Sequence, residues 1–130
     1  HELTRKNLQH QVTVVNPATN DLSVEYLHTS IFVMTSRFEC LPMVLLEAGS
    51  FGVPCVAFDC PTGPADIISG DKSGFLVALE NTDEMAHRIN ELIGNPVRRK
   101  QMGEEARFRS QMYAADVVYT LWQKIFTKNK

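Results

Sequence analysis

From residue 11 to residue 78, short apolar runs alternate with more polar segments. Four runs rich in β-branched and aliphatic residues predict strands, at 11–15, 31–35, 54–58 and 74–78. The run at 31–35 has no polar alternation, which is typical of a strand covered on both faces in a parallel sheet. The intervening segments predict short helices, at 21–29, 42–48 and 64–69. This order indicates an α/β fold, a Rossmann-like, doubly wound parallel sheet of about four strands with flanking helices and right-handed crossovers.

After residue 80 the apolar residues recur at helical spacing. Three helices are predicted, at 82–94, at 96–109 and from about 114 onward. The last of them carries a strong apolar stripe that includes Trp122 and Phe126. We expect these C-terminal helices to follow the sheet, and we expect the stripe to be a packing surface.

Length and composition narrow the class of protein. The 130 residues, 44% of them hydrophobic, fit a single domain over 1–130. The net charge of −2 and the even spread of charges provide no broad basic face, so nucleic acid is not an expected partner. The short basic run at 98–100 is read as a solvated helix face in preference to a phosphate or lipid-headgroup patch.

Cysteine and histidine usage bears on metals and location. The three cysteines are odd in number without CxxC spacing, and the four histidines are scattered, so neither a disulfide framework nor a metal site is expected. This usage favours a cytoplasmic protein. No apolar run approaches the roughly 20 residues that span a bilayer, so any membrane contact is expected to be peripheral. The chain starts at His1 without a methionine, and we expect it to be a fragment of a longer protein.

The loop that follows the run at 31–35 is the richest candidate for a ligand site. In open parallel sheets, ligands bind beyond the carboxyl ends of the strands. This loop, residues 36–42, leads directly into the helix predicted at 42–48, where Pro42 occupies the first helical position. The unpaired amides and the dipole of a helix N-terminus favour an anion such as a diphosphate.

Two glutamates in this segment have two interpretations each. Glu47 lies mid-helix among mostly apolar neighbours, so its carboxylate needs a partner. That partner is either a basic side chain such as Arg37, or solvent, or the two hydroxyls of a ribose. Glu39, on the loop, is either an ordinary solvated acid or an acceptor for sugar hydroxyls. Spacing alone favours the ordinary interpretation of both.

The segment resembles a known family. Two stretches carry the resemblance, Ser36-Arg37-Phe38-Glu39-Cys40-Leu41-Pro42-Met43-Val44-Leu45-Leu46-Glu47-Ala48 and Gly52-Val53-Pro54-Cys55-Val56. They are similar to the E-x7-E region of the retaining glycosyltransferase family 4, which has the GT-B fold of two Rossmann-like domains facing across a cleft. The stretches 59–64 and 73–77 also look like the family's continuation, so the likeness covers almost the whole chain.

The resemblance implies roles for five residues of the segment. Glu39 would contact the transferred sugar and act as the catalytic residue, and Glu47 would bind the ribose. The backbone amides around Cys40, Leu41 and Val44 would hold the diphosphate. The chain departs from the family pattern at Cys40, where members usually have glycine, and at Gly49, where they more often have methionine.

Base contacts are expected from the loop around Asn16 and Pro17. The donor implied is a nucleoside-diphosphate sugar, a UDP-sugar first among them, with no metal or other cofactor. The acceptor is a glycan or a lipid-linked molecule. Family members place a further strand and loop, and an N-terminal acceptor domain, ahead of the segment seen here. We therefore expect this chain to be part of a C-terminal donor domain that does not catalyse transfer by itself.

Two alternatives come from other classes of protein. A receiver-type signalling module would use Asp59, at the end of a predicted strand, as phosphoacceptor, but the acidic pair that such modules carry after their first strand is missing. A second alternative is a nucleotide-sugar-binding subunit that keeps the fold and has lost activity.

Overall fold

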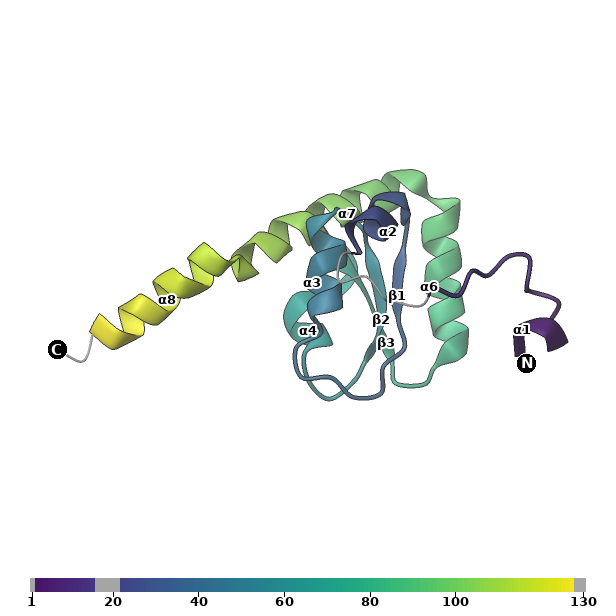
Figure 1. Ribbon diagram of the computed structural model, residues 1–130, viewed down its shortest axis with the longest axis horizontal. Helices are drawn as coiled ribbons and strands as arrows, with labels where there is room; N and C mark the ends of the chain where they lie inside the picture. Colours follow the sequence, from purple (N-terminus) through teal and green to yellow (C-terminus); the bar gives the residue numbers. More distant parts are fainter. Residues whose placement is uncertain (1, 16–21, 128–130) are drawn as a thin grey trace.

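The computed structural model describes residues 2–15 and 22–127. Helices and strands alternate from α2 to β3, with two short helices between β2 and β3, after which the chain is helical (Figure 1). The elements are α1 (Glu2–Arg5), α2 (Ser23–His28), β1 (Phe32–Met34), α3 (Met43–Ser50), β2 (Cys55–Asp59), α4 (Pro64–Ile67), α5 (Gly70–Ser73), β3 (Gly74–Ala78), α6 (Thr82–Gly94), α7 (Pro96–Ser110), a 3-10 turn (Gln111–Tyr113) and α8 (Ala115–Thr127).

The strands of the described residues form a parallel sheet in the order β1-β2-β3. Phe32 lies opposite Cys55 at one end, and Asp59 lies opposite Ala78 at the other. The predicted α/β class and the flanking helices are confirmed. Because the strands are parallel, their carboxyl ends lie at one edge of the sheet, where the chain turns into α3, α4 and α6 (Figure 1).

The predicted strand at 11–15 is wrong. These residues carry no strand pairing, and Val12, Val14 and Val15 are exposed. β-branched residues favour extended backbone, but a strand also needs a neighbour to pair with. β1 is consequently an edge strand of the described sheet, and its middle residue Val33 is 39% exposed. Met34 and Phe32 pack on the face that carries α3, and Ile31 packs on the face that carries α6. The exposure of Val33 shows that the second face is only partly covered along β1.

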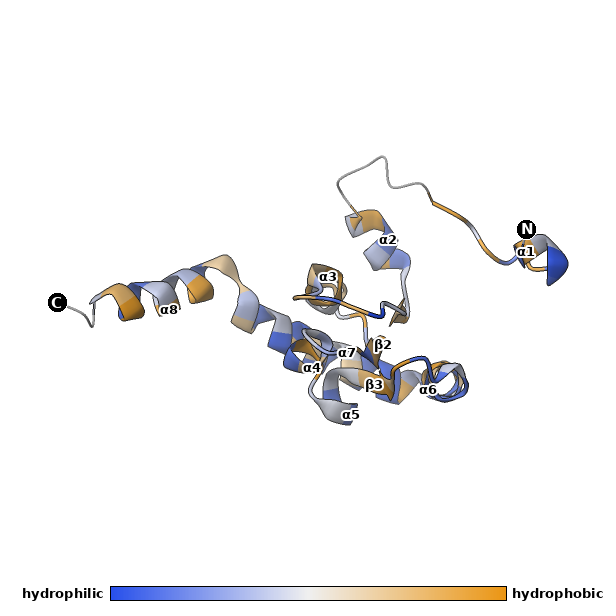
Figure 2. Ribbon diagram, turned by 90° about the horizontal axis from the view of Figure 1, so that it is seen from below, coloured by the Kyte–Doolittle hydropathy of each residue, from blue (hydrophilic) through white to orange (hydrophobic). Residues whose placement is uncertain are grey.

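Side chains that alternate along β2 and β3 separate the core into two clusters. Cys55 and Ala57 pack on one face with residues of α2, α3 and α4. Val56 and Phe58 pack on the other face with residues of α6 and α7. This is the period-two alternation of a strand buried on both sides. Helices α3 and α6 accordingly lie on opposite sides of the sheet (Figure 2).

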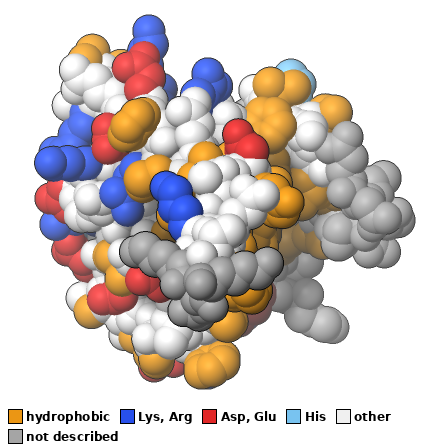
Figure 3. All heavy atoms as spheres, turned by 90° about the vertical axis from the view of Figure 1, so that its left-hand side faces the viewer, with side chains coloured by type: hydrophobic (Ala, Val, Ile, Leu, Met, Phe, Trp, Pro, Cys, Tyr) orange, Lys and Arg blue, Asp and Glu red, His pale blue; other side chains and the backbone are white. Residues whose placement is uncertain are grey.

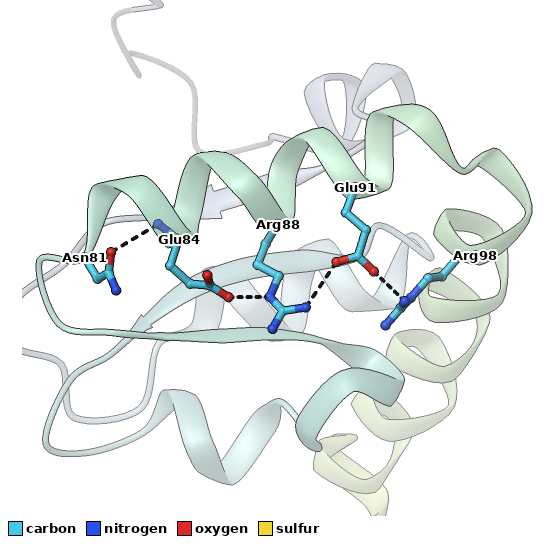
Figure 4. Close-up of polar contacts among 5 residues, drawn as sticks. All are labelled: Asn81, Glu84, Arg88, Glu91 and Arg98. Carbon is cyan, nitrogen blue, oxygen red and sulfur yellow. Dashed lines mark hydrogen bonds and ion pairs between the residues drawn. The ribbon is translucent and has the colours of Figure 1, made fainter.

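Helices α6 and α7 are joined by a chain of ion pairs (Figure 4). Arg88 bonds Glu84 at 2.7 Å and Glu91 at 3.1 Å, and Glu91 also pairs with Arg98 on α7. The guanidinium groups of both arginines lie about 5 Å from the centre of the Phe75 ring, at 4.8 and 5.1 Å. The network therefore covers one end of the core with charged groups that are mutually satisfied.

Helix α8 extends away from the sheet and has no buried residue in its described length (Figure 1). Its apolar side chains remain 37–68% exposed. Figure 3, which views the molecule from this end, shows hydrophobic side chains at the surface among charged ones. The predicted helix is confirmed, but the described residues provide no packing partner for its stripe. Within the described part of the chain, no helix has the length and apolar character that a membrane crossing requires.

Candidate functional site

The loops after the three strands contact one another at the carboxyl edge of the sheet. The Thr62 hydroxyl, after β2, donates a hydrogen bond to the backbone carbonyl of Glu39, after β1. The Arg37 guanidinium, also after β1, pairs at 2.7 Å with the carboxylate of Glu80, after β3. These contacts link the loop at 36–42, which sequence reasoning selected, to both of its neighbours.

Gly63 permits the closest of these approaches. Its backbone has a φ of +94° and a ψ of −57°, a conformation that residues with a side chain rarely adopt. A Cβ placed there would lie 2.6 Å from the carbonyl oxygen of Cys40 and 2.6 Å from Cδ of Pro42. The loop after β2 can therefore lie against the start of α3 only because this position has no side chain.

The N-terminus of α3 opens onto the same loop. The helix begins at Met43, so Pro42 is its N-cap and not, as predicted, its first helical residue. Proline supplies no side-chain cap, and the first bond within the helix runs from the Leu45 amide to the Pro42 carbonyl at 3.0 Å. The amides of Met43 and Val44 precede that bond, and first-turn amides of this kind are the groups that bind anions at a helix N-terminus.

Glu47, on the second turn of α3, is exposed, whereas the sequence predicted an acid emerging among apolar groups. Its Oε2 accepts a hydrogen bond of 3.0 Å from the hydroxyl of Tyr26 on α2. Burial, together with this bond to a carboxylate, raises the pKa of Tyr26 to about 12. Arg37 bonds Glu80, so the basic partner considered for Glu47 is not the one that the structure provides.

The remaining predicted residues lie on the loop or outside the described residues. Glu39 is half-buried, while Cys40 and Leu41 are exposed just before α3. The structure thus assembles 39–47 as one loop and helix at the carboxyl edge. Asn16 and Pro17, predicted to contact the base, lie outside the described residues.

Two hollows of the described surface lie away from this segment. One, of about 530 Å³, is lined by residues of α5 and α7 such as Lys72, Arg98 and Glu105, and another, of about 640 Å³, runs along α8. Neither includes a residue of 36–47. Among the described residues, no three His, Cys, Asp or Glu side chains are grouped closely enough to hold a metal ion. What distinguishes 36–47 is therefore its position at the carboxyl edge of the sheet and the helix N-terminus that it adjoins.

Sequence reasoning missed three contributors to the site. Tyr26 was only an apolar member of a short helix, and 21 residues separate it from Glu47, so no local pattern joins them. Thr62 and Gly63 lie between the strand predicted at 54–58 and the helix predicted at 64–69, where Gly63 precedes Pro64. Gly-Pro is a turn signal, but it does not reveal which other loop the turn contacts.

Two curated relatives are similar over most of this chain. An uncharacterised glycosyltransferase of Haemophilus influenzae is 37% identical over 109 residues, which cover 84% of this chain and 31% of that protein. The amylovoran biosynthesis glycosyltransferase AmsD of Erwinia amylovora is 33% identical over 124 residues, which cover 95% of this chain and 34% of that protein. The chain thus spans about a third of the length of these relatives.

A solved structure and a family model agree with these relatives. A mutant of TarM from S. aureus, in complex with fondaparinux, alpha-GlcNAc-glycerol and UDP, superposes with a TM-score of 0.84 at 29% identity, over 95% of this chain and 25% of that one. The family model described as glycosyl transferases group 1 matches residues 1–109. With its parallel sheet and the loop that opens onto α3, this chain belongs to the group 1 glycosyltransferases, which have the GT-B fold.

Proposed function

We propose that this chain forms the donor-binding part of a longer, retaining hexosyltransferase of family 4. The donor is a nucleoside-diphosphate sugar, with UDP-sugars first, and the acceptor is a glycan or a lipid-linked molecule. The observation that carries the proposal is the position of 39–47, a loop and helix N-terminus at the carboxyl edge of the sheet. Family membership supports it, as does the UDP in the complex of the S. aureus relative.

Each group of the segment has a distinct task in this proposal. The amides around Cys40, Leu41 and Val44 bind the diphosphate, because the dipole of α3 and its unpaired first-turn amides favour negative charge. Glu47 accepts hydrogen bonds from the two ribose hydroxyls with its exposed carboxylate. Glu39, earlier on the same loop, contacts the transferred sugar. We retain Asn16 and Pro17 as the proposed base contacts.

The reaction breaks the bond between the anomeric carbon and the diphosphate oxygen while the acceptor hydroxyl attacks the same face of the sugar, and the proton of that hydroxyl passes to the leaving diphosphate. The diphosphate leaves as an anion, and the helix N-terminus stabilises the charge that develops on it. Positioning and charge stabilisation account for this catalysis, so the proposal includes no metal or other cofactor. The acceptor is held by an N-terminal domain of the same protein. We place the whole protein in the cytoplasm, with a peripheral contact to the membrane.

Titration of the full-length protein with UDP tests the donor site. Glu47→Ala removes hydrogen bonds to a charged acceptor, so the dissociation constant of UDP should rise about 10- to 100-fold. Glu104→Ala is the matched control, since Glu104 is also an exposed helical glutamate but lies on α7. Equal affinities of the wild type, Glu47→Ala and Glu104→Ala proteins would refute the ribose assignment.

A transfer assay with a panel of nucleotide sugars tests the reaction. Glu39→Ala should abolish sugar transfer while changing the affinity for UDP itself by less than about threefold, because UDP lacks the sugar that Glu39 contacts. A wild-type protein that binds UDP and transfers no sugar in the panel would instead be the non-catalytic binding subunit. Membership of a glycosyltransferase family argues against the receiver-type alternative with Asp59 as phosphoacceptor.

A further inference from the structure

Tyr26 is held in place by aromatic contacts beside the candidate ribose-binding glutamate. Its side chain is only 6% exposed. Its ring stacks on Phe51 with centroids 5.5 Å apart and planes at 24°, and it meets Phe32 at 6.1 Å and 54°. Phe32 is the first residue of β1 and Phe51 is the C-cap of α3. The position of the phenol is therefore set by the core and not by α2 alone.

The hydroxyl of the Tyr26 ring, which these contacts hold in place, is directed at Glu47. It donates a hydrogen bond of 3.0 Å to Oε2 of the carboxylate. A phenylalanine ring would fill the core equally well. Packing therefore accounts for the aromatic ring of Tyr26 but not for its hydroxyl. The hydroxyl remains a donor across the physiological range, because even an ordinary tyrosine, with a pKa of about 10, is protonated there. Burial and the contact with Glu47 raise the pKa of Tyr26 further, to about 12.

The bond restricts a side chain that would otherwise be free to rotate. Glu47 is exposed on α3, and an exposed glutamate samples several rotamers, so fixing one of them when a ligand binds costs entropy. A carboxylate has acceptor positions for about four hydrogen bonds, so one bond from Tyr26 leaves room for two ribose hydroxyls. The phenol thus orders the carboxylate before the ligand arrives.

We propose that Tyr26 is a positioning residue that orients the Glu47 carboxylate toward the ribose hydroxyls of the donor, which makes it a determinant of selectivity for ribose. The proposal rests on the role given to Glu47 in the proposed function. It assigns the hydroxyl of Tyr26, and not its ring, to donor binding.

The test compares two ligands in each variant of the full-length protein. Dissociation constants are measured for UDP and for 2′,3′-dideoxyuridine diphosphate, which lacks both ribose hydroxyls. Their ratio within one variant reports the contribution of those hydroxyls, and it does not depend on the folded fraction of that variant. Tyr113→Phe is the matched control, because Tyr113 also donates its hydroxyl, at 2.8 Å, but to the backbone carbonyl of Asp66.

Tyr26→Phe should weaken UDP binding about three- to tenfold and leave dideoxy-UDP binding within about twofold, so that the preference for ribose falls. Tyr113→Phe should leave that preference unchanged. A preference that survives Tyr26→Phe but collapses in Glu47→Ala would overturn the role of Tyr26 and retain that of Glu47. The same fall in Tyr113→Phe would also overturn it. No preference in the wild-type protein would overturn the ribose assignment of Glu47 itself.

Discussion

Replacing Gly63 by alanine tests whether the loop after β2 supports the start of α3. The added Cβ would meet the carbonyl oxygen of Cys40 and Cδ of Pro42, each at 2.6 Å. Real Cβ atoms do not approach backbone so closely, so the loops must separate. Gly70 offers a matched control, because it also has a positive φ, of +50°, but a Cβ there has no heavy atom within 4 Å.

The two substitutions should differ in cost for a physical reason. Alanine at Gly70 is strained only by a left-handed backbone, which costs about 1 kcal/mol. At Gly63 the backbone lies in a rarer region and the clash adds to it, so the expected loss in the free energy of unfolding is about 3 to 5 kcal/mol. The entropy that alanine removes from the unfolded chain is common to both and cancels in the comparison.

Urea unfolding followed by circular dichroism gives the stability of both variants, and UDP titration of the folded proteins gives their affinity. Gly63→Ala should lower stability by at least about 2 kcal/mol more than Gly70→Ala, and it should also weaken UDP binding, because Cys40 and Pro42 shift at the start of α3. Equal losses of stability would show that the close approach does not constrain the loop. A large loss of stability with unchanged affinity would show that this contact does not support the donor site.

Three further measurements test the buried core and the polar groups that contact it. A thiol reagent is applied at about pH 8, near the usual thiol pKa, and the products are read by mass spectrometry. The reagent should modify exposed Cys40 and spare Cys55, because burial raises the pKa of the Cys55 thiol to about 12. Early labelling of Cys55 would contradict its burial. Stability should fall as the pH rises from 10 to about 12, because the folded state holds the Tyr26 proton more tightly than the unfolded state does, and Tyr26→Phe should flatten this part of the pH profile. Arg88→Met should cost about 1 kcal/mol in urea unfolding, and less at high salt, because an ion-pair network over Phe75 is lost; an unchanged midpoint would show that the network adds nothing.

Sequence predicted the elements in which the apolar pattern and the flanking residues indicated the same secondary structure. The helix Thr82–Gly94 was predicted within its observed bounds, and its cap is the Asn81 side chain, which accepts from the Glu84 amide at 3.1 Å. The strand Gly74–Ala78 was likewise predicted as observed. The strand predicted at 11–15 failed because β propensity describes a residue's fit to a sheet and does not supply the neighbouring strand.

For the candidate site, sequence predicted the segment but not its contacts. The glutamate spacing and the proline marked a loop that enters a helix, and the structure has both. The partner of Glu47 could not be read from the sequence, because Tyr26 reaches it through the packing of α2 on α3. Arg37 was the nearest basic candidate in the sequence, and its actual bond to Glu80 depends on how the loops after β1 and β3 meet.

The contacts between the edge loops have a consequence for exchanging donor specificity among relatives. The segment 36–42 is held by Thr62 after β2 and by Glu80 after β3, and Gly63 leaves space for its backbone. A loop grafted alone would meet neighbours shaped for a different backbone. The loops at the carboxyl edge of the sheet should therefore be exchanged together. They are also expected to have diversified together during evolution.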